Sequence, residues 1–156
     1  MNYFLAVGYP LQAGVSSDTL YTTIELRGTT VTLLGEHALL WSRLFQLEQL
    51  GTKDQMIASQ LVELGVVIMA ENPADFLGSL FRLCPIRQGF SIAKEQETLV
   101  CLGDGRWALT PLQMRLWAAS DGCRSFAQVL KLSEPWKPSV LEPLMELMAL
   151  ELLYFH

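Results

Sequence analysis

Apolar residues recur in the same order in the two halves of this 156-residue chain. When the chain is compared with itself at an offset of 76 positions, the pair Leu40-Trp41 coincides with Leu116-Trp117. Closer to the end of each half the offset becomes 86, and the leucine-rich run that starts at Leu61 coincides with the run that starts at Leu147. This repeated order predicts two copies of one small module, with ten extra residues inside the second copy.

Each copy is expected to begin with a β-hairpin. Alternating apolar residues flank a short glycine-containing turn in both halves, which is the pattern of two strands joined by a tight turn. The expected strands are 21–26 and 29–34 in the first copy, and 98–102 and 106–109 in the second, with 89–93 as a preceding strand. The turns contain Arg27-Gly28 and Gly103-Asp104-Gly105, where glycine accepts a positive φ without steric cost.

Helical periodicity follows both hairpins. The expected helices are 36–47 and 52–64 in the first copy, and 111–119, 125–132 and a Leu-rich closing helix from Ser139 to about Leu153 in the second. Thr110 followed by Pro111 predicts a capped helix start, and Ser139 with Glu142 matches a capping box. Between the copies, Asn72-Pro73 begins an amphipathic bridging helix that Pro85 ends.

Composition indicates a folded protein. Hydrophobic residues make up 51% of the chain and charged residues 17%, with a net charge of -5, so the apolar content is sufficient for a core. No apolar run approaches the length of about 20 residues that a membrane span needs. The start of the chain lacks the basic residues of a secretory signal, so a soluble, cytoplasmic protein is expected.

Charge also bears on partners. The chain has 11 basic against 16 acidic residues and no polybasic tract, whereas nucleic-acid binders gather positive charge to neutralise phosphates. A nucleic-acid partner is therefore not expected, unless folding gathers Arg82, Arg87 and Lys94 on one face.

The sequence offers no set of residues for catalysis or metal binding. The three cysteines, Cys84, Cys101 and Cys123, are at least 17 positions apart and are expected to be reduced and buried. His37 and His156 have no third partner at ligand spacing, and His156 is expected to fray. No phosphate-binding glycine loop or nucleophile elbow occurs. We expect no enzyme, no metal and no cofactor.

The second half resembles a known family. The run from Gly89 has a three-strand start, Leu109 before a helix, Asp121-Gly122 followed by a short helix that opens at Ser125, and a Leu-rich closing helix. In this order of elements it resembles the PqqD-like family, also called RiPP recognition elements, which are small winged-helix domains. The resemblance implies an α+β chain of two tandem winged-helix-like modules: a degenerate module 1–71, a bridging helix 72–88 and a PqqD-like module 89–156.

The resemblance also implies a function. Members of the family hold the leader part of a precursor peptide, as an added strand beside the last helix, while a modifying enzyme acts on it. Strand addition takes affinity from main-chain hydrogen bonds and specificity from side-chain pockets. In this chain the receiving edge would be Arg106, Trp107, Ala108 and Leu109. The helix wall would be Val140, Leu141, Leu144 and Met148, and Arg106 and Lys137 would meet acidic side chains of the peptide.

Two other functions stay open. A winged-helix transcription regulator would need a basic recognition helix, but the candidate helices carry Glu63, Glu142 and Glu146 and almost no Arg or Lys. An assembly scaffold that docks a modifying enzyme is compatible with peptide binding. Trp136, in a Pro-rich loop, is a candidate contact residue, whereas Trp41 and Trp117 are expected in the core. The second module is expected to bind, and the first to act as a stabilising cap.

Overall fold

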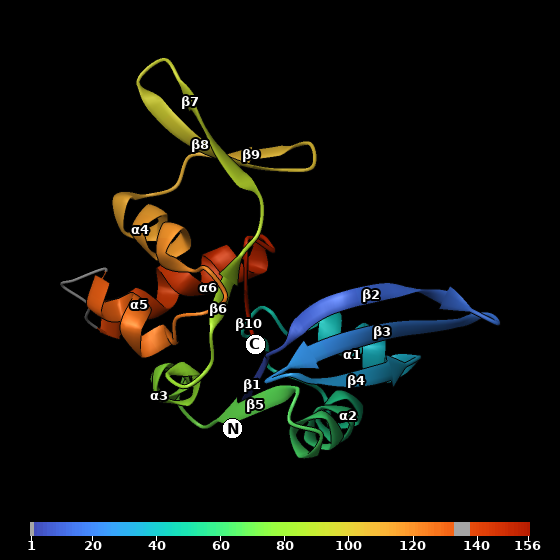
Figure 1. Ribbon diagram of the computed structural model, residues 1–156. Helices are drawn as coiled ribbons and strands as arrows, with labels where there is room; N and C mark the ends of the chain where they lie inside the picture. Colours follow the sequence, from blue (N-terminus) through green and yellow to red (C-terminus); the bar gives the residue numbers. More distant parts are fainter. Residues whose placement is uncertain (1, 133–137) are drawn as a thin grey trace. The chain divides into compact units, whose positions relative to one another are not determined.

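The computed structural model describes residues 2–132 and 138–156. The fold is mixed α+β, as predicted, with six α-helices and four small antiparallel sheets in the described part of the chain (Figure 1). The chain divides into two compact units. Unit 1 comprises the residues up to Leu80 together with Phe155–His156, and unit 2 comprises Phe81–Tyr154. The border after Leu80 lies within the expected bridging segment 72–88.

Unit 1 contains two antiparallel sheets. Strands β2 (Tyr9–Ser16), β3 (Thr19–Leu26) and β4 (Thr29–Leu34) form a three-stranded meander joined by two-residue turns. Arg27 and Gly28 both have positive φ in the second turn, which agrees with the predicted hairpin. Strands β1 (Tyr3–Ala6) and β5 (Val67–Ala70) form the other sheet.

The helices of unit 1 are α1 (Glu36–Arg43), α2 (Thr52–Glu63), a 3₁₀ turn η1 (Pro73–Asp75) and α3 (Phe76–Leu80). Helix α1 packs on the meander through β3 and β4, whereas the helices that follow pack on α1 and on β5. Alternate strand residues face the helices and are buried, because successive side chains of a strand point to opposite faces. The core includes Ile24, Leu33, Leu40, Trp41, Leu61 and Phe76.

Unit 2 also contains a three-stranded meander. Strands β7 (Phe90–Lys94), β8 (Glu97–Leu102) and β9 (Gly105–Trp107) follow one another through two-residue turns. Strand β6 (Pro85–Arg87) pairs with β10 (Leu153–Phe155) in a second, two-stranded sheet.

Three α-helices form the rest of unit 2. They are α4 (Pro111–Ala119), α5 (Phe126–Leu132) and α6 (Leu141–Ala149), the last preceded by a 3₁₀ turn η2 (Pro138–Val140). The predicted start of α4 is confirmed, because the Thr110 hydroxyl accepts from Gln113 N–H at 3.2 Å and Pro111 is the first helical residue. Its core includes Leu116, Trp117, Phe126, Leu144, Leu147 and Met148.

A buried tryptophan occupies the same place in each unit. Trp41 Nε1 donates to the carbonyl oxygens of Val7 at 3.3 Å and Val66 at 3.0 Å. Trp117 Nε1, 76 positions later, donates to the carbonyl oxygen of Gln88 at 3.0 Å. Both side chains are buried, which confirms the prediction that they are core residues.

The backbone around each tryptophan makes matching hydrogen bonds. In unit 1, the N–H of Ala6 donates to Leu44 and that of Val7 to Val66. In unit 2, the N–H of Arg87 donates to Ser120 and that of Gln88 to Leu152. These donors differ by 81 positions and their acceptors by 76 and 86. Each unit therefore contains the same hydrogen-bonded frame, formed by an entering strand, the end of α1 or α4, and the segment after α2 or α6.

Several expected details are wrong. The Leu-rich closing helix ends at Ala149, because Glu151 has a φ of 60° and the chain turns into β10. The Ser139–Glu142 capping box does not form, and Val140 is the N-cap of α6 without a side-chain hydrogen bond. His156 is not frayed. Its Nδ1 lies 2.6 Å from Glu25 Oε2 in unit 1.

In residues 2–132 and 138–156, none of the helices has both the length and the apolar character needed to cross a lipid bilayer.

Candidate functional site

The β7–β8–β9 sheet is the element of unit 2 with the most exposed strand surface. In Figure 1 it stands out beyond the helices of its own unit. Phe90, at the start of β7, is 62% exposed, although Val100 and Cys101 in the central strand are buried. Strands β7 and β9 are the two edges of this sheet. Each pairs with β8 on one side and with no strand of the described residues on the other side.

Four predicted site residues lie on and just after β9. Arg106 and Trp107 belong to the strand, and Ala108 and Leu109 follow it before the cap of α4. Hydrogen bonding alternates in an antiparallel pair, so Trp107 faces β8 with its backbone groups whereas Arg106 directs its N–H and C=O outward. The N–H groups of Ala108 and Leu109 have no hydrogen-bond partner among the described residues. The segment 106–109 therefore offers unpaired backbone donors and acceptors.

The predicted helix wall is mostly core. Val140, Leu144 and Met148 are buried, and only Leu141 is partly exposed. Gln113 in α4 holds α6 in place, because its Nε2 donates to the Pro143 carbonyl at 3.3 Å and to Glu146 Oε2 at 2.7 Å. The described structure thus does not bring these buried residues together with the β9 edge as an open groove. Lys137 and Trp136 lie outside the described residues.

A hollow that the sequence did not predict lies beside the other edge, β7. It has a volume of about 420 Å³ and is lined by Arg87, Gly89, Phe90, Ser91, Trp117 and Ala118. The Arg87 guanidinium lies 5.6 Å from the centre of the Trp117 ring and donates to the Ala118 carbonyl at 2.9 Å. Gly89 could have indicated from the sequence that two backbone segments approach each other closely here. A Cβ at this position would overlap the carbonyl oxygen of Cys101.

Unit 1 differs at the corresponding edge. Pro10 in β2 stands 81 positions before Ser91, and the strand has an irregular register between Pro10 and Gln12. Proline lacks an N–H, so it removes one donor from that edge. Unit 2 keeps this donor.

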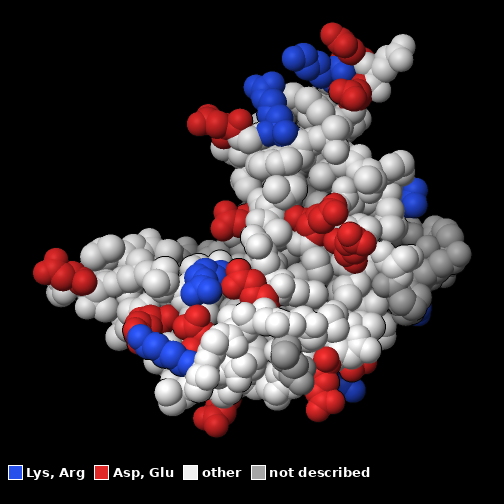
Figure 2. Space-filling view, turned by 180° about the vertical axis from the view of Figure 1, so that it is seen from behind, with Lys and Arg blue, Asp and Glu red and all other residues white. Residues whose placement is uncertain are grey.

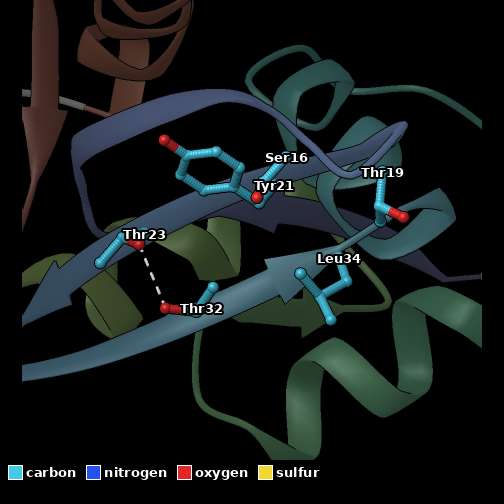
Figure 3. Close-up of a pocket in the computed structure, with 6 residues that line it drawn as sticks. All are labelled: Ser16, Thr19, Tyr21, Thr23, Thr32 and Leu34. Carbon is cyan, nitrogen blue, oxygen red and sulfur yellow. Dashed lines mark hydrogen bonds between the residues drawn. The ribbon is translucent and has the colours of Figure 1, made fainter.

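The outer face of the unit 1 meander carries a second hollow, of about 520 Å³ (Figure 3). It is lined by Ser16, Thr19, Tyr21, Thr23, Thr32 and Leu34. The Thr23 and Thr32 hydroxyls are 3.1 Å apart, in a cross-strand pair. These are hydroxyl, aromatic and aliphatic groups, with no carboxylate–base pair among them.

Charged side chains in the described residues pair locally. Lys53 donates to Glu36 at 2.7 Å, which lowers the pKa of Glu36 and raises that of Lys53. The carboxylate of Asp121 accepts from the N–H groups of Arg124 and Cys123, each at 2.9 Å, and these bonds lower its pKa. No three His, Cys, Asp or Glu side chains in the described parts of the chain gather as metal ligands.

The cysteines are not all buried, contrary to the sequence-based expectation. Cys101 is buried, Cys84 is partly exposed and Cys123 is exposed. Cys123 is exposed because it lies in the turn between α4 and α5, where the chain reverses direction.

Comparison of the whole chain with protein-family models, curated proteins and solved structures finds no match.

Proposed function

We propose that this chain binds a peptide as an added strand on the β9 edge, and that the peptide is the leader part of a ribosomally made precursor. The observation that carries the proposal is the set of unpaired backbone groups at Arg106, Ala108 and Leu109, on either side of Trp107, which pairs with β8. Strand addition satisfies such groups directly. The resemblance of the second half to RiPP recognition elements supplies the class of peptide.

The proposal includes the architecture. The two units are two tandem winged-helix-like modules that arose as copies of one. The matching hydrogen bonds of Trp41 and Trp117 support this, as does the match between the turns Arg27-Gly28 and Gly103-Asp104. The second copy contains α5 (Phe126–Leu132), which falls in the ten-residue difference between the offsets.

The buried α6 residues limit how specificity arises. Val140, Leu144 and Met148 are buried in the core and cannot contact a peptide. The side chains that would distinguish one peptide from another are therefore those along the β9 edge and Leu141. Arg106 is exposed and is the residue on β9 suited to an acidic peptide side chain. The chain itself performs no chemistry on the peptide, and a modifying enzyme is the expected second partner, in the cytoplasm.

DNA binding receives no support from the charges. On the face shown in Figure 2, Lys and Arg side chains are scattered among Asp and Glu and form no continuous patch. Arg43 lies 3.3 Å from Glu48, and Arg87 is held over Trp117, so two of the cations already have partners. This face therefore offers no continuous basic surface for the phosphate contacts that dominate DNA affinity.

The test is calorimetric titration with the precursor peptide encoded next to the gene for this chain. We expect a Kd of about 1 μM or lower, in the range of specific peptide recognition. Ala108→Pro removes one outward donor without removing a large side chain, and should weaken binding by about 1–3 kcal/mol. Thermal melts of each variant check that folding is unchanged.

Two matched variants locate the edge. Thr32→Pro removes an outward donor from β4 at the corresponding position in unit 1 and should leave binding unchanged. Ser91→Pro removes an outward donor from β7 in unit 2, at the position that corresponds to Pro10 in β2 of unit 1. Weaker binding by Ser91→Pro alone would move the site to the β7 hollow, and absence of heat at concentrations well above micromolar would contradict the proposal.

A further inference from the structure

Two cysteines far apart in sequence lie next to each other in unit 2. Cys84 immediately precedes β6, and Cys123 lies in the turn between α4 and α5. The Sγ atom of Cys84 donates to the carbonyl oxygen of Cys123 at 3.6 Å. Both are free thiols, Cys123 is exposed and Cys84 is partly exposed.

A backbone bridge lies two positions away from each of these cysteines. Ile86 and Asp121 form an antiparallel bridge, and two positions further along each chain are Cys84 and Cys123. Next to this bridge, the N–H of Gly122 donates to the carbonyl of Pro85 at 2.9 Å, and the N–H of Arg87 donates to the carbonyl of Ser120 at 2.9 Å. This hydrogen-bond pattern makes Ile86 and Asp121 a non-hydrogen-bonded pair, a type with Cα atoms about 4.5 Å apart. Gly122 has a φ of 81°, so the chain leaves the extended conformation before Cys123, and the approach of the two cysteines rests on the hydrogen bond from Cys84 Sγ to the Cys123 carbonyl.

We propose that Cys84 and Cys123 form a reversible intramolecular disulfide when the chain meets a small-molecule disulfide, such as glutathione disulfide. The Cys123 thiolate attacks one sulfur of the reagent, forms a mixed disulfide and expels one glutathione thiolate. Cys84 then loses its proton to solvent and attacks Cys123 Sγ, which expels the second glutathione. Two protein thiols are oxidised and one small disulfide is reduced to two thiols.

Exposure and protonation set the order of attack. Cys123 is exposed and reacts first, because an attacking thiol must reach the reagent. Burial raises the pKa of the Cys84 thiol, and the nearby Cys123 and Asp121 raise it further, so Cys84 is the resolving residue. Cys101 is 5% exposed in the centre of the β7–β8–β9 sheet and stays reduced.

The bond would close a loop that holds most of the candidate site. The segment from Cys84 to Cys123 contains β6, the whole β7–β8–β9 sheet and α4. A crosslink across the base of this segment restricts the unfolded chain and stabilises unit 2. The disulfide does not depend on peptide binding, so either proposal can fail without the other.

The experiment incubates the full-length chain with glutathione disulfide and maps its cysteines by mass spectrometry. The expected product is a monomer about 2 Da lighter, with Cys84 linked to Cys123 and one of the three thiols remaining. Its thermal midpoint should rise by about 5–10 °C and return after treatment with dithiothreitol.

Single substitutions supply the controls. Cys123→Ala should block oxidation, Cys84→Ala should stop at glutathionylated Cys123, and Cys101→Ala should oxidise as the parent chain does. A product that stays glutathionylated at Cys123 in the parent chain, a link through Cys101 or a covalent dimer would each overturn the proposal.

Discussion

The two units share a frame but differ in what that frame leaves open. In each, a buried tryptophan donates to a backbone carbonyl of the strand segment that enters the unit. In unit 1 the β2 edge carries Pro10, and β2 and β3 are longer than β7 and β8. In unit 2 the residue at the corresponding position is Ser91, which keeps its N–H, and Cys84 Sγ donates to the backbone carbonyl of Cys123. The difference indicates that the frame stabilises both units, whereas an outward donor at the position of Pro10 and the thiol pair are particular to unit 2.

The largest expected effect comes from removing either tryptophan. Trp41→Ala and Trp117→Ala should each lower the free energy of unfolding by about 3–5 kcal/mol, because each leaves a large cavity and an unpaired carbonyl. Chemical unfolding followed by circular dichroism measures both. If one substitution costs less than about 1 kcal/mol while the other unfolds its unit, the two residues do not play the same part.

A smaller effect is expected at the glycine that follows the entering strand. Gly8 and Gly89 both have positive φ, of 107° and 82°. A Cβ on Gly89 would meet the backbone carbonyl of Cys101, which is part of the paired central strand, whereas on Gly8 it would meet Cγ2 of the buried Ile24, a side-chain atom that shifts at less cost than a strand backbone. Gly89→Ala should therefore cost about 2 kcal/mol or more, and Gly8→Ala less. Equal midpoints in thermal melts of the two variants would contradict this ranking.

The smallest effect concerns the hydrogen-bonded pair of Glu25 and His156 in unit 1. Burial raises the pKa of Glu25, but the N–H of Gly28 and the imidazole of His156 lower it more, so the net shift is downward. A lowered pKa in the folded state contributes stability above the unfolded pKa of about 4.3, and this contribution is lost as pH falls through the folded value. Glu25→Gln should cost at most about 1 kcal/mol at pH 6, since the pair is partly exposed.

The pH dependence separates this pair from other carboxylates. The difference in unfolding free energy between the parent chain and Glu25→Gln should shrink between pH 5 and pH 3, measured by urea titration at each pH. Glu97→Gln, on the exposed start of β8, is the control and should show no such trend. A difference that grows as pH falls would reverse the sign of the argument.

The sequence predicted correctly those helices and strands whose ends are marked by turn or capping residues next to them in the chain. The strand at 29–34 and the helix at 111–119 are confirmed with their boundaries, because a glycine turn and a Thr-Pro cap mark them in the sequence. The repeat also located Trp41 and Trp117 in the core. In these cases the residues that specify the structure are neighbours along the chain.

Strand pairing between distant parts of the chain could not be predicted from these local sequence patterns. Strands β1, β5, β6 and β10 have three or four residues each and are specified by partners more than 60 positions away. The apolar run near Leu152 is compatible with both helix and strand, so the change of structure after Glu151 could not be predicted. The β7 hollow and the contact of Cys84 with Cys123 likewise depend on β6 lying against the α4–α5 turn.

The most direct measurement is hydrogen–deuterium exchange of backbone amides with and without the neighbouring precursor peptide. If the β9 edge of unit 2 receives the peptide, exchange should slow by about tenfold or more at Arg106 and Ala108, whose N–H groups are otherwise unpaired. The amides of Thr30 and Thr32 on the β4 edge of unit 1 should be unaffected. Protection confined to Thr30 and Thr32, or to Ser91 and Ala93 on β7, or no protection at saturating peptide, would contradict the account.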